Sequence, residues 1–214
     1  MNIKPLEIYR GAVPCSLGEL LDDLESVQEV MPFDSGPFGC SIPLPHSDLL
    51  HSDFRNHYNN QPFADVLDPS ANEVNFPAFQ SIFDMFEAEK TAFRLVKRPP
   101  QSAYKLHQDS DRGEGVWRFQ VPIISGQKAR LCLSDQTSIP EDRSDPDVFT
   151  PELFAKRFPT HRIESLEVGN LHIFNVDYIH TVINDDAYHR ITLLLDIMMN
   201  EKTEKWCNQH MMPI

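Results

Sequence analysis

Histidine and aspartate residues spaced as His-x-Asp are the residues of this chain whose types and spacing favour metal chemistry. The pattern occurs at His46-Ser47-Asp48, His51-Ser52-Asp53 and His107-Gln108-Asp109. Residues i and i+2 of a strand project to the same side, so each copy would present an imidazole and a carboxylate together. Two neutral imidazoles and one carboxylate are the ligand set of non-haem Fe(II) oxygenases. In a chain with nine histidines, about one match is expected by chance, so the motif alone decides little.

The sequence context separates the three copies. The first two lie in an irregular, Pro-flanked region with no strand after them, which is typical of an exposed polar loop. His107 instead ends a strand-like run, and a Gly-punctuated turn follows at 111–115. Beyond the turn, apolar residues alternate with Arg118 and Gln120, which predicts a strand with one polar face. We therefore interpret the third copy as metal-binding, and Trp117, on the apolar face, as a core residue.

A third ligand is predicted from a later strand. His180 lies in FNVDYIHTVIND, where a strand-turn-strand would present it. Ten residues later, Arg190 and Thr192 share one face of the predicted strand HRITLLLDIMM, whose other face is apolar. An unpaired buried charge is very costly, so a buried Arg190 needs an anion. That anion is either the far carboxylate of 2-oxoglutarate, held in a bidentate fork, or a structural acid such as Asp177 or Asp196.

The composition is that of an ordinary folded protein. The chain has 214 residues, of which 41% are hydrophobic and 24% charged, so we expect one domain with a substantial core. Its net charge of -13 disfavours nucleic acid and anionic membranes as partners, because both attract basic surfaces. We expect a small-molecule or peptide substrate, and the oligomeric state stays open.

The cellular location is predicted from the N-terminus and the cysteines. The opening MNIKPLEIYRGAV lacks the apolar stretch of a signal peptide, and no apolar run is long enough to span a bilayer. The four cysteines are scattered without a CxxC pair, which is typical of reduced thiols and disfavours a zinc finger or a disulfide scaffold. These features predict a cytoplasmic protein.

Residues 1–91 are predicted to be helical and irregular and to shape the substrate site. A capping box, Ser-Leu-Gly-Glu, opens a helix over 17–30, and a second helix starts near Pro77. Residues 31–70 show no clear pattern apart from a short strand near 39–42. So long an irregular stretch favours a lid or a wall of a binding site.

From residue 92 the chain changes to short strand-like runs separated by turns. The runs are AFRLVKR, AYKLHQ, GVWRFQVPII, ARLCLS, RIESLEV, LHIFNV, HTVIN and HRITLLLDIMM. A short helix interrupts them at 151–157, with Thr150 as its N-cap. Many short strands at regular spacing predict a sandwich or a closed jelly-roll barrel. We expect a mainly β fold with flanking helices, a core over 92–198 and a C-terminal tail at 199–214.

The second half of the chain resembles a known family. The runs RPPQSAYKLHQD, WRFQVPI and VGNLHIFNVDYIHTVINDDAYHRITLLLDI are similar to the aspartyl/asparaginyl β-hydroxylases. That family includes cis-proline-hydroxylase-like members and belongs to the 2-oxoglutarate/Fe(II)-dependent oxygenases. The resemblance covers about residues 92–198. Its most specific pattern comprises Gly169, Phe174, His180, Val182, Asn184 and Arg190.

The resemblance implies a double-stranded β-helix core, of the jelly-roll type also found in cupins. It implies that Fe(II) is bound by His107, Asp109 and His180. It further implies that Arg190 binds the C5 carboxylate of 2-oxoglutarate and that Arg118 also contacts this cosubstrate.

Two departures from the family bear on the site. The family has a His two residues after the Arg of its central strand, where this chain has Gln120, so that cosubstrate contact changes its chemistry. The animal β-hydroxylases of folded domains lack the acidic metal ligand, whereas Asp109 is present here. Its presence places the chain nearer the bacterial or small-substrate members and disfavours a halogenase. We assign Gln120 and Thr192 to the cosubstrate site together with the two arginines.

These features predict a dioxygenase that uses Fe(II), 2-oxoglutarate and O2 and releases succinate and CO2. It would hydroxylate an unactivated C–H bond of an amino acid or an amino-acid residue, of the aspartyl, asparaginyl or proline type. Substrate contacts are expected from Asp111, Arg112 and Arg55, although plain solvated surface explains each of them as well. Two alternatives stay open: a zinc hydrolase-like metalloprotein with the same ligand types, and a cupin-like binding protein without a metal.

Overall fold

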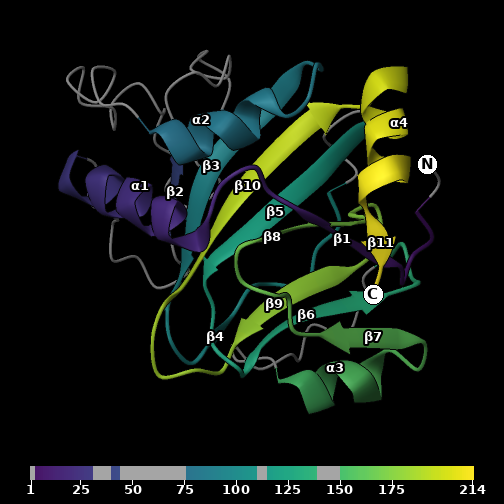
Figure 1. The fold of residues 1–214 in the computed structure, drawn as a ribbon. Helices are drawn as coiled ribbons and strands as arrows, with labels where there is room; N and C mark the ends of the chain where they lie inside the picture. The colour runs from purple at the N-terminus through teal and green to yellow at the C-terminus, as the bar shows by residue number, and fades with distance from the viewer. Residues whose placement is uncertain (1–2, 31–39, 44–75, 110–114, 139–149) are drawn as a thin grey trace.

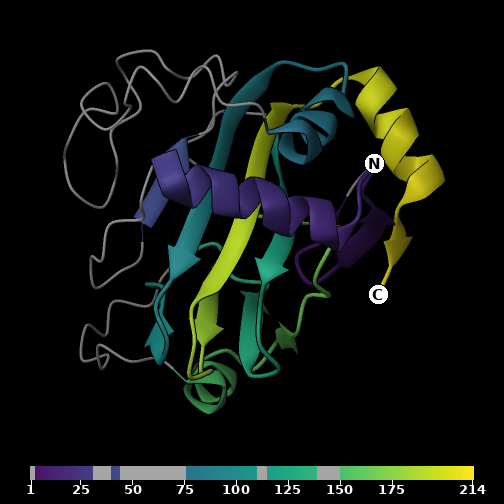
Figure 2. The ribbon, with the colours of Figure 1, turned by 60° about the vertical axis from the view of Figure 1, so that its left-hand side comes forward.

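Two antiparallel β-sheets, stacked face to face, form the centre of the protein (Figure 1). The structure is a computed structural model that describes residues 3–30, 40–43, 76–109, 115–138 and 150–214. Helices cover the outer side of each sheet, as a second view confirms for the larger one (Figure 2). The space between the two sheets is therefore the interior of the fold.

The larger sheet has seven strands in the order β11-β1-β8-β5-β10-β3-β2. They are β1 (Ile8–Ala12), β2 (Cys40–Pro43), β3 (Lys90–Arg98), β5 (Val116–Ile124), β8 (Asn170–Phe174), β10 (Arg190–Met198) and β11 (Met212–Pro213). The smaller sheet has four strands in the order β4-β9-β6-β7. They are β4 (Ser102–Ala103), β6 (Ala129–Ser134), β7 (His161–Glu164) and β9 (His180–Asn184).

The strand order defines a jelly roll. Along the chain, the strands from β3 to β10 pass from one sheet to the other, except that β6 and β7 are neighbours in the smaller sheet. The first of these strands pairs with the last, β4 pairs with β9, and β5 pairs with β8, all antiparallel. Eight strands wound in this way are a double-stranded β-helix. The predicted fold class, mainly β with flanking helices, is confirmed.

In the part of the chain that the structure describes, four helices flank the sheets. They are α1 (Leu17–Val30), α2 (Pro77–Asp84), α3 (Pro151–Arg157) and α4 (Glu201–His210). The predicted capping box is present: the Ser16 hydroxyl accepts the Glu19 N–H at 3.3 Å, and the Glu19 carboxylate accepts the Ser16 N–H at 2.7 Å. The start of α2 is capped from α1, because the Asp23 carboxylate accepts the Phe79 N–H at 2.8 Å. Thr150 caps α3 as predicted.

Three apolar clusters formed by the described residues hold these layers together. The largest lies between the larger sheet and helices α1 and α2, which bury residues such as Leu20, Leu24 and Phe79 against it. A second cluster lies between the two sheets and includes Phe174 from the larger one and Leu131 from the smaller one. A third packs α3 under the smaller sheet. At about 1.5–3 kcal/mol for each large side chain removed from water, these clusters supply the main stabilising contribution of the fold.

The structure adds elements that the sequence patterns do not predict. Strand β1, in the N-terminal part of the chain, pairs with β8, and α4 and β11 occupy the region predicted to be a tail. Asn200 accepts the Thr203 N–H at 2.9 Å and caps α4, but the helix buries only Thr203 and Cys207, so its periodicity is weak. None of the described helices is long and apolar enough to cross a membrane.

Candidate metal centre

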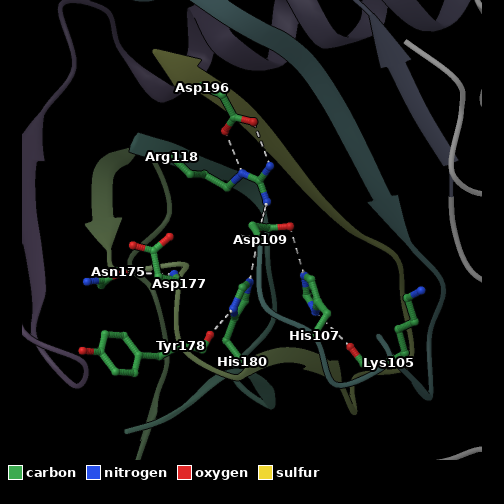
Figure 3. Close-up of polar contacts among 9 residues, drawn as sticks. All are labelled: Lys105, His107, Asp109, Arg118, Asn175, Asp177, Tyr178, His180 and Asp196. Atoms are coloured by element: carbon green, nitrogen blue, oxygen red, sulfur yellow. Dashed lines mark hydrogen bonds and ion pairs between the residues drawn. The ribbon is translucent and has the colours of Figure 1, made fainter. Parts of the chain in front are cut away.

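Three predicted ligands converge at one end of the space between the sheets (Figure 3). One ligand atom from each of His107, Asp109 and His180 lies within 4.8 Å of the others. The His107 Nε2 atom is 4.0 Å from one carboxylate oxygen of Asp109, and the His180 Nε2 atom is 3.6 Å from the other. Atoms at these separations can be brought onto one ion by small side-chain rotations.

The backbone brings the three ligands together although no long strand carries the first two. A strand is predicted over 103–108, but the structure has only β4 followed by a single bridge between His107 and His180. In that bridge each residue donates its N–H to the other's carbonyl, at 3.1 and 2.8 Å. The Asp109 N–H donates to the Val176 carbonyl at 2.9 Å. These bonds fasten the segment after β4 to the segment that leads into β9.

Both imidazoles are held in the tautomer that a metal ligand requires. The Nδ1 atom of His107 lies 3.0 Å from the Lys105 carbonyl, and the Nδ1 atom of His180 lies 2.9 Å from the Tyr178 carbonyl. A carbonyl oxygen can only accept a hydrogen bond, so each Nδ1 carries the hydrogen. In the neutral imidazole the lone pair then lies on Nε2, and in both residues Nε2 points toward the carboxylate of Asp109 (Figure 3).

The carboxylate ligand is bound in turn by an arginine. Arg118 Nη1 donates to Asp109 at 2.6 Å, while Arg118 Nε and Nη2 donate to the two oxygens of Asp196 at 2.7 and 2.8 Å. All three side chains are largely shielded from water. The structure therefore places Arg118 between the metal ligand and a second acid, whereas its predicted contact with a cosubstrate stays a prediction.

The remaining residues assigned to the cosubstrate site share the inner face of the larger sheet. Gln120 lies two residues along β5 from Arg118, and Arg190 and Thr192 lie on β10, which pairs with β5. All are buried. Burial, and next the nearby charge of Arg98, lower the pKa of Arg190 to about 10.

The two alternatives for the partner of Arg190 can now be compared. Asp196 is bound by both of its oxygens to Arg118, and Asp177 is exposed. Among the described residues, no acid pairs with the Arg190 guanidinium. The hydroxyl of Thr192 also lacks a hydrogen-bond partner there. Within the described residues, neither of the two acids considered from the sequence pairs with Arg190, and the Thr192 hydroxyl has no acceptor.

Two further residues of this face were not predicted. Arg98 lies directly opposite Arg190 on β3 and is 4% exposed; its guanidinium stacks over the Tyr104 ring, which contacts the His107 ring edge-on. His172 lies opposite Gln120 on β8 and is fully buried. Burial and the charges of nearby arginines lower the pKa of His172. The alternation in AFRLVKR predicts that Arg98 shares a face with Arg94, whereas a single His within LHIF is typical of a core position and indicates no polar site.

Several predicted residues fall elsewhere. Asp111, Arg112 and Arg55 lie outside the described residues, as do the first two His-x-Asp copies and most of the region predicted to be a lid or a wall. Trp117 packs against the core as predicted, but it also borders a cavity of about 200 Å³. The cavity is lined by Ile3, Val116, Trp117, Phe174, Asn175, Val176 and Asp177.

The chain is similar to several solved structures, among them a 2OG-Fe(II) oxygenase family protein, HygX and a cupin domain. A 2OG-Fe(II) oxygenase family protein from Burkholderia pseudomallei is 13% identical with a TM-score of 0.45, over 84% of this chain and 78% of that chain. HygX from Streptomyces hygroscopicus, solved with nickel and 2-oxoglutarate, is 15% identical with a TM-score of 0.47, over 92% and 84%. A cupin domain from Bordetella pertussis is 15% identical with a TM-score of 0.33, over 54% and 88%.

No protein-family model and no curated protein sequence matches the chain. Because the TM-scores above lie below 0.5, the fold assignment rests on the strand order of the two sheets.

Proposed function

We propose that this protein is a 2-oxoglutarate- and Fe(II)-dependent dioxygenase that hydroxylates a C–H bond. The observation that carries the proposal is a pairing of two features inside one jelly roll. A His/Asp/His cluster lies at one end of β9. The strand that follows begins with Arg190, a buried guanidinium for which the described residues offer no acid. A zinc hydrolase would use the first feature but has no need of the second.

The donor set fits iron. Two neutral imidazoles that direct Nε2 toward Asp109, together with its carboxylate, would leave further coordination positions of an iron ion for other ligands. Cysteine, which would favour zinc or copper(I), is absent from the cluster. Lys105 and Tyr178 hold the imidazoles through their carbonyls, so the residues around the site match the support that metal-binding histidines need.

The inner face of the larger sheet fits an anionic cosubstrate. Arg190 and Arg98 place two positive charges side by side on β10 and β3. Two buried cations repel each other, and a bound dicarboxylate would offset that cost. The Thr192 hydroxyl offers another donor on the same strand. Arg190 can hold one carboxylate through two parallel N–H donors, which Lys cannot do.

When bound, Fe(II) and 2-oxoglutarate would supply the oxidising chemistry, with O2 consumed and succinate and CO2 released. The chain's own residues bind and orient. His107, Asp109 and His180 would fix the metal, and Arg190 would set the direction of the cosubstrate along the inner face. The side chains of His107, Asp109 and His180 are 18%, 11% and 3% exposed, which limits the access of water to them.

We further propose that the substrate is an amino acid or an amino-acid residue, of the aspartyl, asparaginyl or proline type. This finer proposal rests on the resemblance of residues 92–198 to the aspartyl/asparaginyl β-hydroxylases. The predicted substrate contacts, Asp111, Arg112 and Arg55, belong to it, as does the expected cytoplasmic location. Succinate release over a panel of free amino acids and short peptides tests it; release with none of them would contradict the substrate class.

An anaerobic titration tests the reaction class. Adding 2-oxoglutarate to the protein with Fe(II) should produce a visible metal-to-ligand charge-transfer band. Arg190→Met should weaken 2-oxoglutarate binding by roughly 10²- to 10⁴-fold, because two charge-assisted hydrogen bonds of about 1.5–3 kcal/mol each are lost. Fe(II) binding should be unchanged, and Arg157→Met, at the end of α3, should alter neither. Absence of the band, or an unchanged cosubstrate affinity in Arg190→Met, would rule the proposal out.

A further inference from the structure

A buried acid–arginine–acid chain ends on the carboxylate of the candidate metal centre. Arg118 Nη1 donates to Asp109 at 2.6 Å, and its Nε and Nη2 atoms donate to Asp196 at 2.7 and 2.8 Å (Figure 3). The side chain of Asp196 is 1% exposed. Each guanidinium nitrogen thus donates to a carboxylate, and the fork toward Asp196 is bidentate, which fixes the plane of the guanidinium.

The pairing of β5 with β10 distinguishes the roles of Asp196 and Asp109. Arg118 and Asp196 are directly opposite in the pairing of β5 with β10, so their contact is built into the register of the sheet. Asp109 lies outside any strand and is held by the Val176 carbonyl, in the turn between β8 and β9, and by Arg118 of β5. The rigid pair is therefore Arg118 with Asp196, and Asp109 is the member that the pair holds.

We propose that Asp196 is a positioning residue of the metal centre, acting through Arg118 on the carboxylate of Asp109. It holds the guanidinium so that one N–H fixes the rotation of the Asp109 carboxylate. It also supplies a second negative charge for the guanidinium. Without that charge, the positive charge of Arg118 would be balanced by Asp109 alone, and Asp109 would attract a cation less strongly.

The expected size follows from the general behaviour of residues that support metal ligands. Removing such a partner lowers metal affinity by roughly 10- to 100-fold. Asp196→Asn keeps the size of the side chain and removes its charge, so it should lower affinity within that range. Arg118→Lys keeps the charge but cannot donate to two carboxylates in a fixed plane, so it should lower affinity as well.

The test uses the full chain and Co²⁺ alone, with calorimetry for affinity and the visible ligand-field bands of Co²⁺ for geometry. The inference rests on the metal site of the proposed function but not on its oxygen chemistry. We expect weaker Co²⁺ binding and altered bands in Asp196→Asn and in Arg118→Lys. Phe119→Leu is the matched control: it alters the residue next to Arg118 on the opposite face, so it should lower stability while leaving Co²⁺ binding unchanged.

Two outcomes would overturn the inference. One is wild-type Co²⁺ affinity in a folded Asp196→Asn protein. The other is a loss of 2-oxoglutarate binding in Arg118→Lys with Co²⁺ affinity unchanged, which would make Arg118 a cosubstrate contact. Thermal unfolding of the metal-free variants shows whether each is folded. Normal Co²⁺ binding without the charge-transfer band would defeat the oxygenase proposal and leave this inference standing.

Discussion

The two faces of the larger sheet differ although the same strands form both. The outer face carries Phe119, Leu193 and Leu195, each 1% exposed or less, packed under helices. The inner face carries Arg118, Gln120 and other polar side chains that are also buried. A strand that alternates in this way stabilises the fold through one face only, because buried polar groups gain little unless they are paired.

The polar side chains of the inner face are not all paired in the same way. Part of the inner face is fully paired, as in the contacts of Arg118 with Asp109 and Asp196. Another part, around Arg190 and Thr192, has donors without acceptors in the described residues. Protein folding alone does not favour such an arrangement, and a bound anion would. The outer face should therefore respond to mutation in stability, and the inner face in binding.

The largest effect is expected on the outer face. Phe119→Ala should lower the free energy of unfolding by about 3–5 kcal/mol, because it removes a fully buried ring that packs on the Phe86 ring at 4.7 Å. Chemical denaturation of the metal-free protein measures it. Phe119→Leu should cost less, since it leaves a smaller void. A loss below about 1 kcal/mol for the alanine variant would remove the distinction between the faces.

A smaller effect of opposite sign is expected on the inner face. Arg190→Met should raise the free energy of unfolding of the ligand-free protein by about 1–3 kcal/mol, because an apolar side chain replaces a buried cation that lies beside Arg98. The same denaturation experiment measures it, with Arg157→Met as control. A marked destabilisation would mean that Arg190 has a structural partner after all.

The smallest effect concerns His172 and pH. Burial lowers the pKa of His172, so the unfolded chain takes up the proton more readily than the folded one. The contribution of His172 to stability should therefore be complete above the unfolded pKa of about 6.5 and be lost as pH falls below it. His172→Gln should flatten the fall in stability between about pH 7 and pH 5. His210→Gln, at an exposed position, is the control, and an equal slope in wild type and His172→Gln would contradict the assignment.

Much of the site was predictable because its residues carry distinct chemistry at strand spacing. The choice of His107 over the two other His-x-Asp copies depended on the strand that follows it, and β5 is where the pattern placed it. His180 and Arg190 open β9 and β10. Whether Asp196 pairs with Arg190 or with another residue could not be predicted, because spacing does not reveal which side chain a neighbouring strand places opposite an acid. Only the register of β5 against β10 gives Asp196 to Arg118.

The elements missed by the sequence patterns are those that tertiary contacts stabilise. Strand β1 is five residues long, and its sequence IYRGA has no clear alternation; it exists because β8 offers an edge. Helix α4 is mostly polar, yet Trp206 packs edge-on against the Phe86 ring at 5.0 Å. One or two anchoring side chains are enough to dock such an element, and they leave no periodic signal.

The carbonyls of Lys105 and Tyr178, which hold the two imidazoles, have a consequence for how this centre can change. Each carbonyl belongs to the peptide two residues before its histidine, so no side-chain substitution at 105 or 178 removes it. The orientation of both imidazoles is therefore set by the backbone conformation and not by a supporting side chain. The carboxylate is supported by side chains instead, through Arg118 and Asp196. Substitutions that change the metal affinity while keeping the three ligands should therefore act mainly on Arg118 and Asp196, the side chains that support Asp109.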